Sequence, residues 1–142
     1  DLLARSKKDR ESRVLTGKSD YVAREEILVP DRQSAELAAA ARRNNPNAVG
    51  SIPLEYIDET LQFHPEWVVD KIAPRPLLLI TTDDDRLVPP DESEALYAKA
   101  GEPKRLAVLK GWGHYEVYAG RAFEEVMGET LAWYRKHLPS RV

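Results

Sequence analysis

Asp85 and His114 are the residues of this 142-residue sequence whose types and positions could perform acid–base chemistry. Each follows closely on an apolar run of the sequence. A carboxylate that accepts the Nδ1 proton of an imidazole fixes its tautomer and stabilises the imidazolium that forms when Nε2 takes a proton from a nucleophile. Gly111 and Gly113 would let the backbone turn tightly and present His114. The two residues therefore predict an acid–base pair if the fold brings their loops together.

The order of elements from residue 76 onward favours such a meeting. The pattern predicts alternating strands and helices: strand 77–80, helix 91–101, strand 104–109 and helix 122–137. In the first of these helices Asp91 and Glu94 have capping-box spacing, and Gly101 is a stop signal. This order predicts right-handed crossovers and a parallel sheet, whose ligands lie beyond the carboxyl ends of the strands. Both unusual loops are expected at that edge.

The last predicted helix carries an apolar stripe that we expect to lie on the sheet. Its members recur at helical spacing: Phe123, Val126, Met127, Thr130, Leu131 and Tyr134. The region before the sheet is predicted to be mainly helical: a polar helix at 1–14 that begins before Asp1, a loop at 19–30, a helix after the N-cap Asp31, a helix at 54–63 and a short helix at 65–72.

Composition excludes several classes of function. The net charge of −3 gives no general reason to expect a nucleic-acid partner, since binding to a polyanion needs a clustered basic surface. No apolar run approaches the ~18 residues that span a bilayer, so no membrane partner is expected. The absence of cysteine removes disulfides and thiol nucleophiles and fits a reducing compartment, and we therefore expect a cytoplasmic location.

Two motifs in this region resemble those of a known family. The segment from Asp85 to Pro89 reads D-x-x-V-P after a strand, and the segment from Gly111 to His114 reads G-x-G-H after the next strand. Over residues 73–138 the chain resembles the C-terminal part of an α/β-hydrolase. The resemblance implies that Asp85 is the acid and His114 the base of a Ser-His-Asp triad, that the substrate is a small ester or related acyl compound, and that no cofactor is needed.

The same resemblance gives a fold class and a domain division. It implies an α/β fold whose parallel strands are flanked by helices and whose sheet is incomplete. Residues 73–142 would form the C-terminal strand–helix–strand–helix part of the hydrolase core. Residues 1–72 resemble, more loosely, the helical cap that bacterial members of the family insert before these strands.

The nucleophile of such a triad is missing from the sequence. Family members carry it in G-x-S-x-G at a strand-to-helix turn, and that motif does not occur here. Ser51 follows Gly50, but no predicted strand precedes it and Pro53 stands where the motif needs glycine. We therefore expect the serine, the oxyanion hole and most of the sheet upstream of Asp1, in a missing N-terminal half, and we expect this chain alone to be inactive.

Other interpretations of the same residues remain open. His114 could be a structural histidine, and a metal could bind His114 with Asp83–Asp85, although consecutive aspartates on a turn cannot all reach one ion. We therefore predict no metal site, with Asp83 and Asp84 facing solvent or Arg86. Trp112 and Tyr115 could line a substrate pocket or close the sheet edge.

Two further patterns are weak. The tripeptide Gly17-Lys18-Ser19 matches the end of a phosphate-binding loop, but Ser12 stands where that loop needs a glycine. The acidic run after LLLI is similar to the acidic pocket of a receiver domain, which would need an aspartate rather than His114 after the next strand.

A function of a different class is a non-catalytic, self-associating interaction module or structural fragment. Two strands alone leave an unpaired edge that another chain usually covers, either a second copy or the missing N-terminal half.

Overall fold

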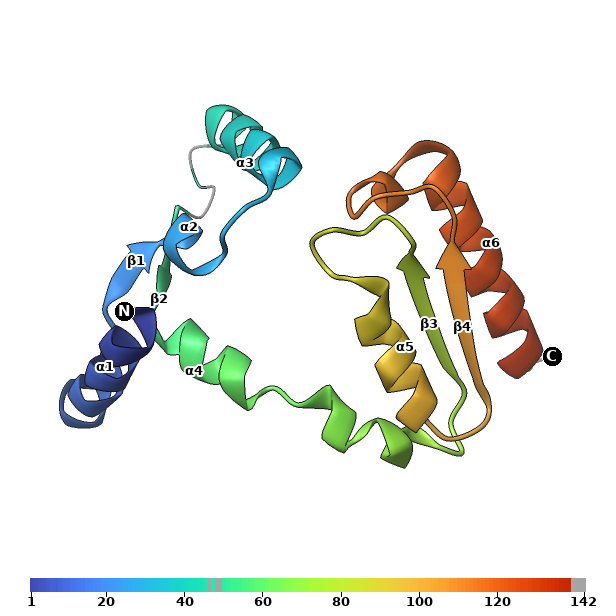
Figure 1. Ribbon diagram of the computed structural model, residues 1–142, viewed down its shortest axis with the longest axis horizontal. Coiled ribbons are helices and arrows are strands. Elements are labelled where there is room, and N and C mark those ends of the chain that lie inside the picture. Colours follow the sequence, from blue (N-terminus) through green and yellow to red (C-terminus); the bar gives the residue numbers. More distant parts are fainter. Residues whose placement is uncertain (46, 48–49, 139–142) are drawn as a thin grey trace. The chain divides into compact units, whose positions relative to one another are not determined.

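The computed structural model describes residues 1–45, 47 and 50–138, and the chain divides into two compact units. Unit 1 comprises Asp1–Phe63 and unit 2 comprises His64–Val142 (Figure 1). This boundary lies before Ala73, the position at which the sequence patterns change from helical to alternating. None of the described helices is long and apolar enough to cross a membrane.

Unit 1 consists of helices around a two-stranded antiparallel ribbon. Its elements are α1 (Leu2–Thr16), β1 (Tyr21–Ala23), α2 (Arg24–Ile27), α3 (Arg32–Asn44), β2 (Ser51–Pro53) and α4 (Glu55–Gln62). Val22 pairs with Ile52 in the ribbon. The side chains of Val22, Leu54 and Ile57 are buried together and form a small apolar core.

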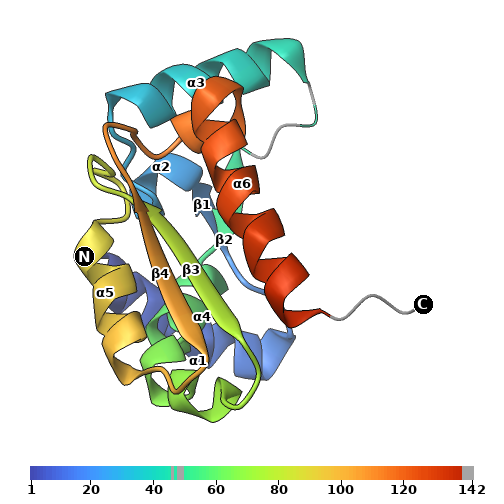
Figure 2. The same cartoon turned by 90° about the vertical axis from the view of Figure 1, so that its right-hand side faces the viewer.

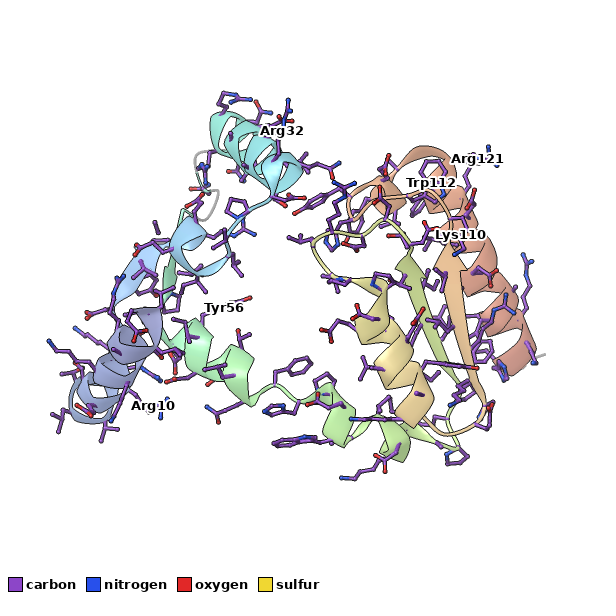
Figure 3. The ribbon with its side chains drawn as sticks, in the orientation of Figure 1. Arg10, Arg32, Tyr56, Lys110, Trp112 and Arg121 are labelled. Carbon is purple, nitrogen blue, oxygen red and sulfur yellow. The ribbon has the colours of Figure 1, made fainter. Side chains whose placement is uncertain are left out.

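A charged network supplements this small core. Asp58 on α4 is 3% exposed, and its carboxylate accepts hydrogen bonds from Ser6 (2.8 Å), Arg10 (2.6 Å) and Arg13 (2.6 Å). The three donors lie on α1, where Arg10 is labelled in Figure 3. The hydrogen bond from Arg10 is the largest of the effects that lower the pKa of Asp58 to about 2, against the opposing effect of burial. Asp58 therefore joins α1 to α4 as a buried carboxylate.

The structure corrects one prediction for unit 1 and confirms another. Within the given sequence the first helix spans Leu2–Thr16, and the Asp1 side chain accepts a hydrogen bond from the Leu3 N–H. The stretch 19–30, predicted as a loop, contains β1 and α2. Local patterns miss β1 because it is stabilised by pairing with β2, far along the chain. The cap at Asp31 is confirmed, since its side chain accepts from the Ser34 N–H.

Unit 2 is built on two parallel strands with a helix on each side (Figures 1 and 2). Its elements are η1 (Pro65–Trp67), η2 (Val69–Ile72), β3 (Leu77–Thr82), α5 (Pro90–Lys99), β4 (Lys104–Leu109), η3 (Glu116–Tyr118) and α6 (Gly120–His137). The β3–β4 register runs from Leu77 opposite Lys104 to Thr82 opposite Leu109. The predicted strands, their parallel pairing and the helix that follows each strand are confirmed. The described sheet of unit 2 has only these two strands, which agrees with the expected incomplete sheet.

The start of α5 and the packing of α6 differ from prediction. Helix α5 begins at Pro90 without a side-chain cap, so Asp91 lies inside the first turn and no capping box forms. Proline favours the first helical position because its fixed φ suits a helix and the N–H that it lacks would have no partner there. In α6 the most buried residues are Ala122 and Trp133, at 1% and 8% exposure.

Half of the predicted stripe on α6 is therefore exposed. Phe123, Leu131 and Tyr134 keep 44%, 42% and 53% of their surface exposed. A sheet of two strands is too narrow to cover the whole apolar face of a helix of this length. The other three members, Val126, Met127 and Thr130, are half-buried, so the predicted stripe is only partly covered in the described residues.

Candidate active site

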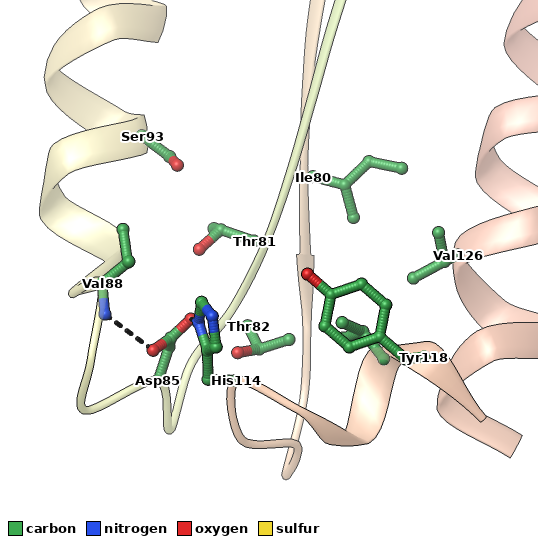
Figure 4. Close-up of a pocket in the computed structure, with 10 residues that line it drawn as sticks. Ile80, Thr81, Thr82, Asp85, Val88, Ser93, His114, Tyr118 and Val126 are labelled. Carbon is green, nitrogen blue, oxygen red and sulfur yellow. Dashed lines mark hydrogen bonds and ion pairs between the residues drawn. The ribbon is translucent and has the colours of Figure 1, made fainter. Parts of the chain in front are cut away.

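Asp85 and His114 meet beyond the carboxyl ends of β3 and β4. Since Thr82 lies opposite Leu109 at the end of the ladder, the loops that follow the two strands leave the sheet at the same level. His114 Nδ1 lies 2.8 Å from Asp85 Oδ2. The predicted proximity of these two side chains is therefore present in the fold (Figure 4).

The other oxygen of Asp85 is held by the backbone. Asp85 Oδ1 accepts hydrogen bonds from the N–H groups of Leu87 (2.9 Å) and Val88 (2.8 Å). Burial by itself raises the pKa of Asp85, but the hydrogen bonds from Val88, His114 and Leu87 outweigh it and hold this pKa below the ordinary value. Asp85 is consequently an ionised acceptor at neutral pH. An ionised acceptor at this position requires His114 Nδ1 to carry a hydrogen.

The side chains of the pair differ in exposure, which bears on what each can do. Asp85 is 10% exposed and His114 is 26% exposed. Asp85 is thus enclosed by its hydrogen-bond donors, whereas part of the imidazole ring remains accessible. With Nδ1 committed to Asp85, Nε2 is the ring atom that can exchange a proton with a bound group.

The three consecutive aspartates have three different partners. Asp83 Oδ1 accepts a hydrogen bond from the Gly111 N–H at 2.7 Å, while Asp84 lies 3.4 Å from Arg86 on the surface. The prediction that Asp84 faces solvent and Arg86 is confirmed. Asp83 is also exposed, as predicted, but its carboxylate in addition reaches across to the loop after β4. Sequence patterns do not reveal this contact, since it depends on the β3–β4 register.

A cavity of about 260 Å³ adjoins the pair. Its lining combines apolar and polar side chains: Ile80, Thr81, Thr82, Asp85, Val88, Ser93, His114, Val117, Tyr118 and Val126 (Figure 4). The Thr82 hydroxyl is buried and has no hydrogen-bond partner among the described residues. Sequence analysis missed Thr82, although a polar pair at the carboxyl end of an apolar strand is a signal that could have indicated it.

Trp112 and Tyr115 lie next to His114 in sequence but outside the lining of this cavity. Trp112 Nε1 donates a hydrogen bond to Glu125 at 3.1 Å, and the Tyr115 ring packs edge-on against the His114 ring, with 4.8 Å between ring centroids. Both side chains support the loop that carries His114. A contact of either one with substrate stays a prediction.

Other candidate groups lie elsewhere or are not found. Ser51 is the first residue of β2 in unit 1, so it does not stand between a strand and a helix. Within residues 1–45, 47 and 50–138 there is no group of three or more His, Asp or Glu side chains placed to hold a metal ion. The pair Asp85 and His114 and the cavity beside it form the candidate site.

Comparison with known proteins places this geometry in a wider context. No protein-family model matches the chain. It is 26% identical over 145 residues to a thiohydrolase of Eupenicillium brefeldianum, and this alignment covers 95% of this chain and 47% of that protein. It is 32% identical over 79 residues to a polyketide transferase of Aspergillus fumigatus, and this alignment covers 55% of this chain and 27% of that protein.

Similarity to a solved structure extends over nearly the whole chain. The α/β-hydrolase GrgF from Penicillium superposes with a TM-score of 0.75 at 23% sequence identity, covering 96% of this chain and 48% of that one. The chain thus spans about half, or less, of the length of the proteins that it matches, which is consistent with a C-terminal portion. The chain therefore has an α/β-hydrolase fold, of which it contains a part with a small parallel sheet.

Proposed function

We propose that this chain supplies the acid and the base of a serine α/β-hydrolase triad. The observation that carries the proposal is the 2.8 Å contact between His114 Nδ1 and Asp85 Oδ2 at the carboxyl ends of parallel strands in an α/β-hydrolase fold. Asp85 orients the imidazole and stabilises its protonated form. His114 is the catalytic base, since its Nε2 is left to act on the nucleophile.

The reaction is acyl transfer to a hydroxyl and then to water. His114 Nε2 takes the proton of a serine hydroxyl as that oxygen forms a bond to the acyl carbon, and it then gives the proton to the leaving group. In the second step it takes a proton from water and returns it to the serine. The relatives named as a thiohydrolase and a polyketide transferase support an ester or related acyl substrate.

The serine and the oxyanion hole are proposed to come from a part of the protein outside this chain. The sequence contains no G-x-S-x-G, and the solved α/β-hydrolase that it matches is about twice as long. In this proposal residues 1–72 are the helical cap-like region of the hydrolase, the protein is cytoplasmic, and the chain alone is inactive. Oxyanion-hole donors contribute much of the rate enhancement in acyl transfer, so their absence matters as much as that of the serine.

The test is an assay of the chain expressed together with the coding region that precedes it. Hydrolysis of p-nitrophenyl acetate is expected to fall on the order of 10³–10⁴-fold in His114→Ala and in Asp85→Asn, because both changes abolish proton transfer to or from a correctly oriented imidazole. Asp84→Asn is the matched control, since the exposed Asp84 side chain pairs with Arg86 on the surface. Unchanged activity in the first two variants would rule out the triad.

A second candidate function, self-association through the sheet edge, has its own observation. Beside β3 and α6 lies an apolar cavity of about 310 Å³ lined by Pro76, Leu77, Leu78, Ile80, Thr130, Trp133 and Tyr134. One of these lining side chains, Tyr134 on α6, keeps 53% of its surface exposed. A strand from a second copy could pair with β3 and cover it. Light scattering on the purified chain tests this candidate, because a stable monomer of 16.1 kDa contradicts it.

A further inference from the structure

The loop that carries His114 is held by carboxylates from three different positions. Asp83 accepts the Gly111 N–H, Glu116 accepts the Gly113 N–H, and Glu125 accepts the Trp112 side-chain N–H. Gly111 and Gly113 supply the tight turn, and glycine is the residue that least restricts the backbone. A loop with two glycines can adopt many conformations. External hydrogen bonds are therefore needed to select the one that brings His114 to Asp85.

Asp83 is the acceptor with the most direct connection to the sheet. Its own N–H donates to the Leu109 carbonyl at 3.1 Å, so the β3–β4 ladder continues to this residue. Its side chain then accepts from Gly111 at 2.7 Å, and Lys110 Nζ lies 3.5 Å from its second oxygen. The Gly111 hydrogen bond is the main cause of a lowered pKa at Asp83, so the carboxylate is ionised at neutral pH. Asp83 thus ties the loop after β4 to the end of the two strands.

Glu116 closes the same loop from its other end. Glu116 Oε2 accepts from the Gly113 N–H at 2.5 Å, and the Glu116 N–H donates to the Gly113 carbonyl at 3.3 Å. A Cβ atom added to Gly113 would lie 3.2 Å from that carboxylate oxygen, which is a tight contact. The two hydrogen bonds enclose His114 and Tyr115 in a short closed turn. The direction in which His114 leaves the backbone is fixed by this turn.

We propose that Asp83 and Glu116 are positioning residues that hold the His114 loop so that Nδ1 reaches Asp85. Both act on backbone N–H groups on either side of Trp112, which is labelled with Lys110 in Figure 3. The expected effect on catalysis rests on the proposed function. The positioning of the His114 loop does not, because it follows from hydrogen bonds within this chain. The acidic run after β3 therefore has two working members, Asp85 for the imidazole and Asp83 for its loop.

The first experiment reads the imidazole directly in the 142-residue chain and needs no activity. Long-range ¹H–¹⁵N NMR spectra of histidine distinguish the Nδ1–H from the Nε2–H tautomer, and His114→Gln assigns the signals. Wild type is expected to show the Nδ1–H tautomer at His114. Asp83→Ala and Glu116→Ala are expected to shift His114 towards the tautomer mixture of free histidine, while the fold, followed by circular dichroism, is kept.

Conservative variants separate positioning from a general structural effect. Asp83→Asn keeps an oxygen that can accept the Gly111 N–H, so it is expected to retain the Nδ1–H tautomer. Asp84→Ala, on the exposed neighbour, is the matched control and is expected to behave as wild type. If Asp83→Ala fails to fold, Glu116→Ala still decides, because Glu116 is exposed. A wild-type spectrum in Glu116→Ala and in a folded Asp83→Ala would overturn the proposal.

The second experiment reads the consequence for catalysis in the co-expressed protein. Asp83→Ala is expected to lower kcat by about 10- to 100-fold with little change in KM, because misplacing a catalytic group affects the chemical step. Asp83→Asn is expected to restore most of this loss. If the co-expressed protein is inactive, the proposed function fails while the tautomer result still stands. A kcat unaffected by Asp83→Ala in an active protein contradicts the positioning role.

Discussion

Asp58 in unit 1 and the largely enclosed Asp85 in unit 2 have different partners, and the difference separates a structural carboxylate from one proposed to take part in chemistry. In unit 1, Asp58 is bound by the guanidinium groups of Arg10 and Arg13, which keep their charge at every physiological pH. In unit 2, Asp85 is bound by two backbone N–H groups and by the imidazole of His114. Burial alone therefore does not distinguish the two carboxylates, whereas the chemical type of their partners does.

The units can be observed separately, which makes the comparison testable. The three tryptophans, Trp67, Trp112 and Trp133, all lie in unit 2. Tryptophan fluorescence therefore follows unit 2, whereas helical circular dichroism follows both units. A change confined to unit 1 should therefore alter the circular dichroism signal and leave the tryptophan fluorescence unaltered.

The largest effect on stability is expected from Trp133→Ala in unit 2. The Trp133 side chain is 8% exposed and packs against His137, so its removal leaves a cavity in the core. The free energy of unfolding of unit 2 should fall by about 3–5 kcal/mol. Urea unfolding followed by the fluorescence of the two remaining tryptophans measures this. Trp67→Ala, at a residue 67% exposed, is the control, and an equal loss there would show that burial does not explain the effect.

Asp58→Asn should have the next largest effect, and only in unit 1. The change leaves Arg13, which is 19% exposed, with a weaker partner and removes the charge that joins α1 to α4. We expect a loss of about 2–3 kcal/mol in the free energy of unfolding, measured by circular dichroism in urea. Glu36→Gln, in the exposed pair with Arg32, should change it by less than about 0.5 kcal/mol. A shift of the fluorescence transition in Asp58→Asn would contradict an effect confined to unit 1.

The pH dependence of unit 1 should follow Asp58. Its pKa is about 2 in the folded chain, below the ordinary value of 3.8, so ionised Asp58 stabilises the folded form. That stabilisation, roughly 2 kcal/mol, is complete above pH ~4 and is lost as the pH falls through ~2. Urea midpoints by circular dichroism between pH 5 and 2 measure it. Asp58→Asn should flatten the dependence, and an unchanged slope in this variant would assign the effect to other groups.

The smallest effects are expected from two glycines that share the left-handed backbone conformation. Gly17 in unit 1 and Gly111 in unit 2 have φ of 69° and 75°, where a side chain is unfavourable. Alanine at either position should cost about 1–2 kcal/mol in the free energy of unfolding. Only Gly111→Ala should also change the tautomer of His114, because its N–H is the group that Asp83 holds. An equal tautomer change in Gly17→Ala would contradict this distinction.

Sequence patterns predicted unit 2 better than unit 1. The apolar run at β3, the helix after each strand and the cap at Asp31 follow from the residues at those positions and their immediate neighbours. The ribbon formed by β1 and β2 was missed because each strand has three residues, too few to show a period, and is stabilised by its distant partner. The N-terminal limit of α5 was misplaced because Pro90, rather than Asp91, begins the helix.

The sequence by itself determined which residues could form an acid–base pair and that they would lie at the carboxyl ends of the strands. Motif spacing and alternating elements are local properties, and the carboxyl ends of parallel strands coincide whatever the remaining packing is. The tertiary structure alone decided that Asp83 holds Gly111, that Thr82 faces the cavity and that Asp58 joins two helices. These contacts depend on register and packing between residues far apart in the chain, and local propensities carry no information about them.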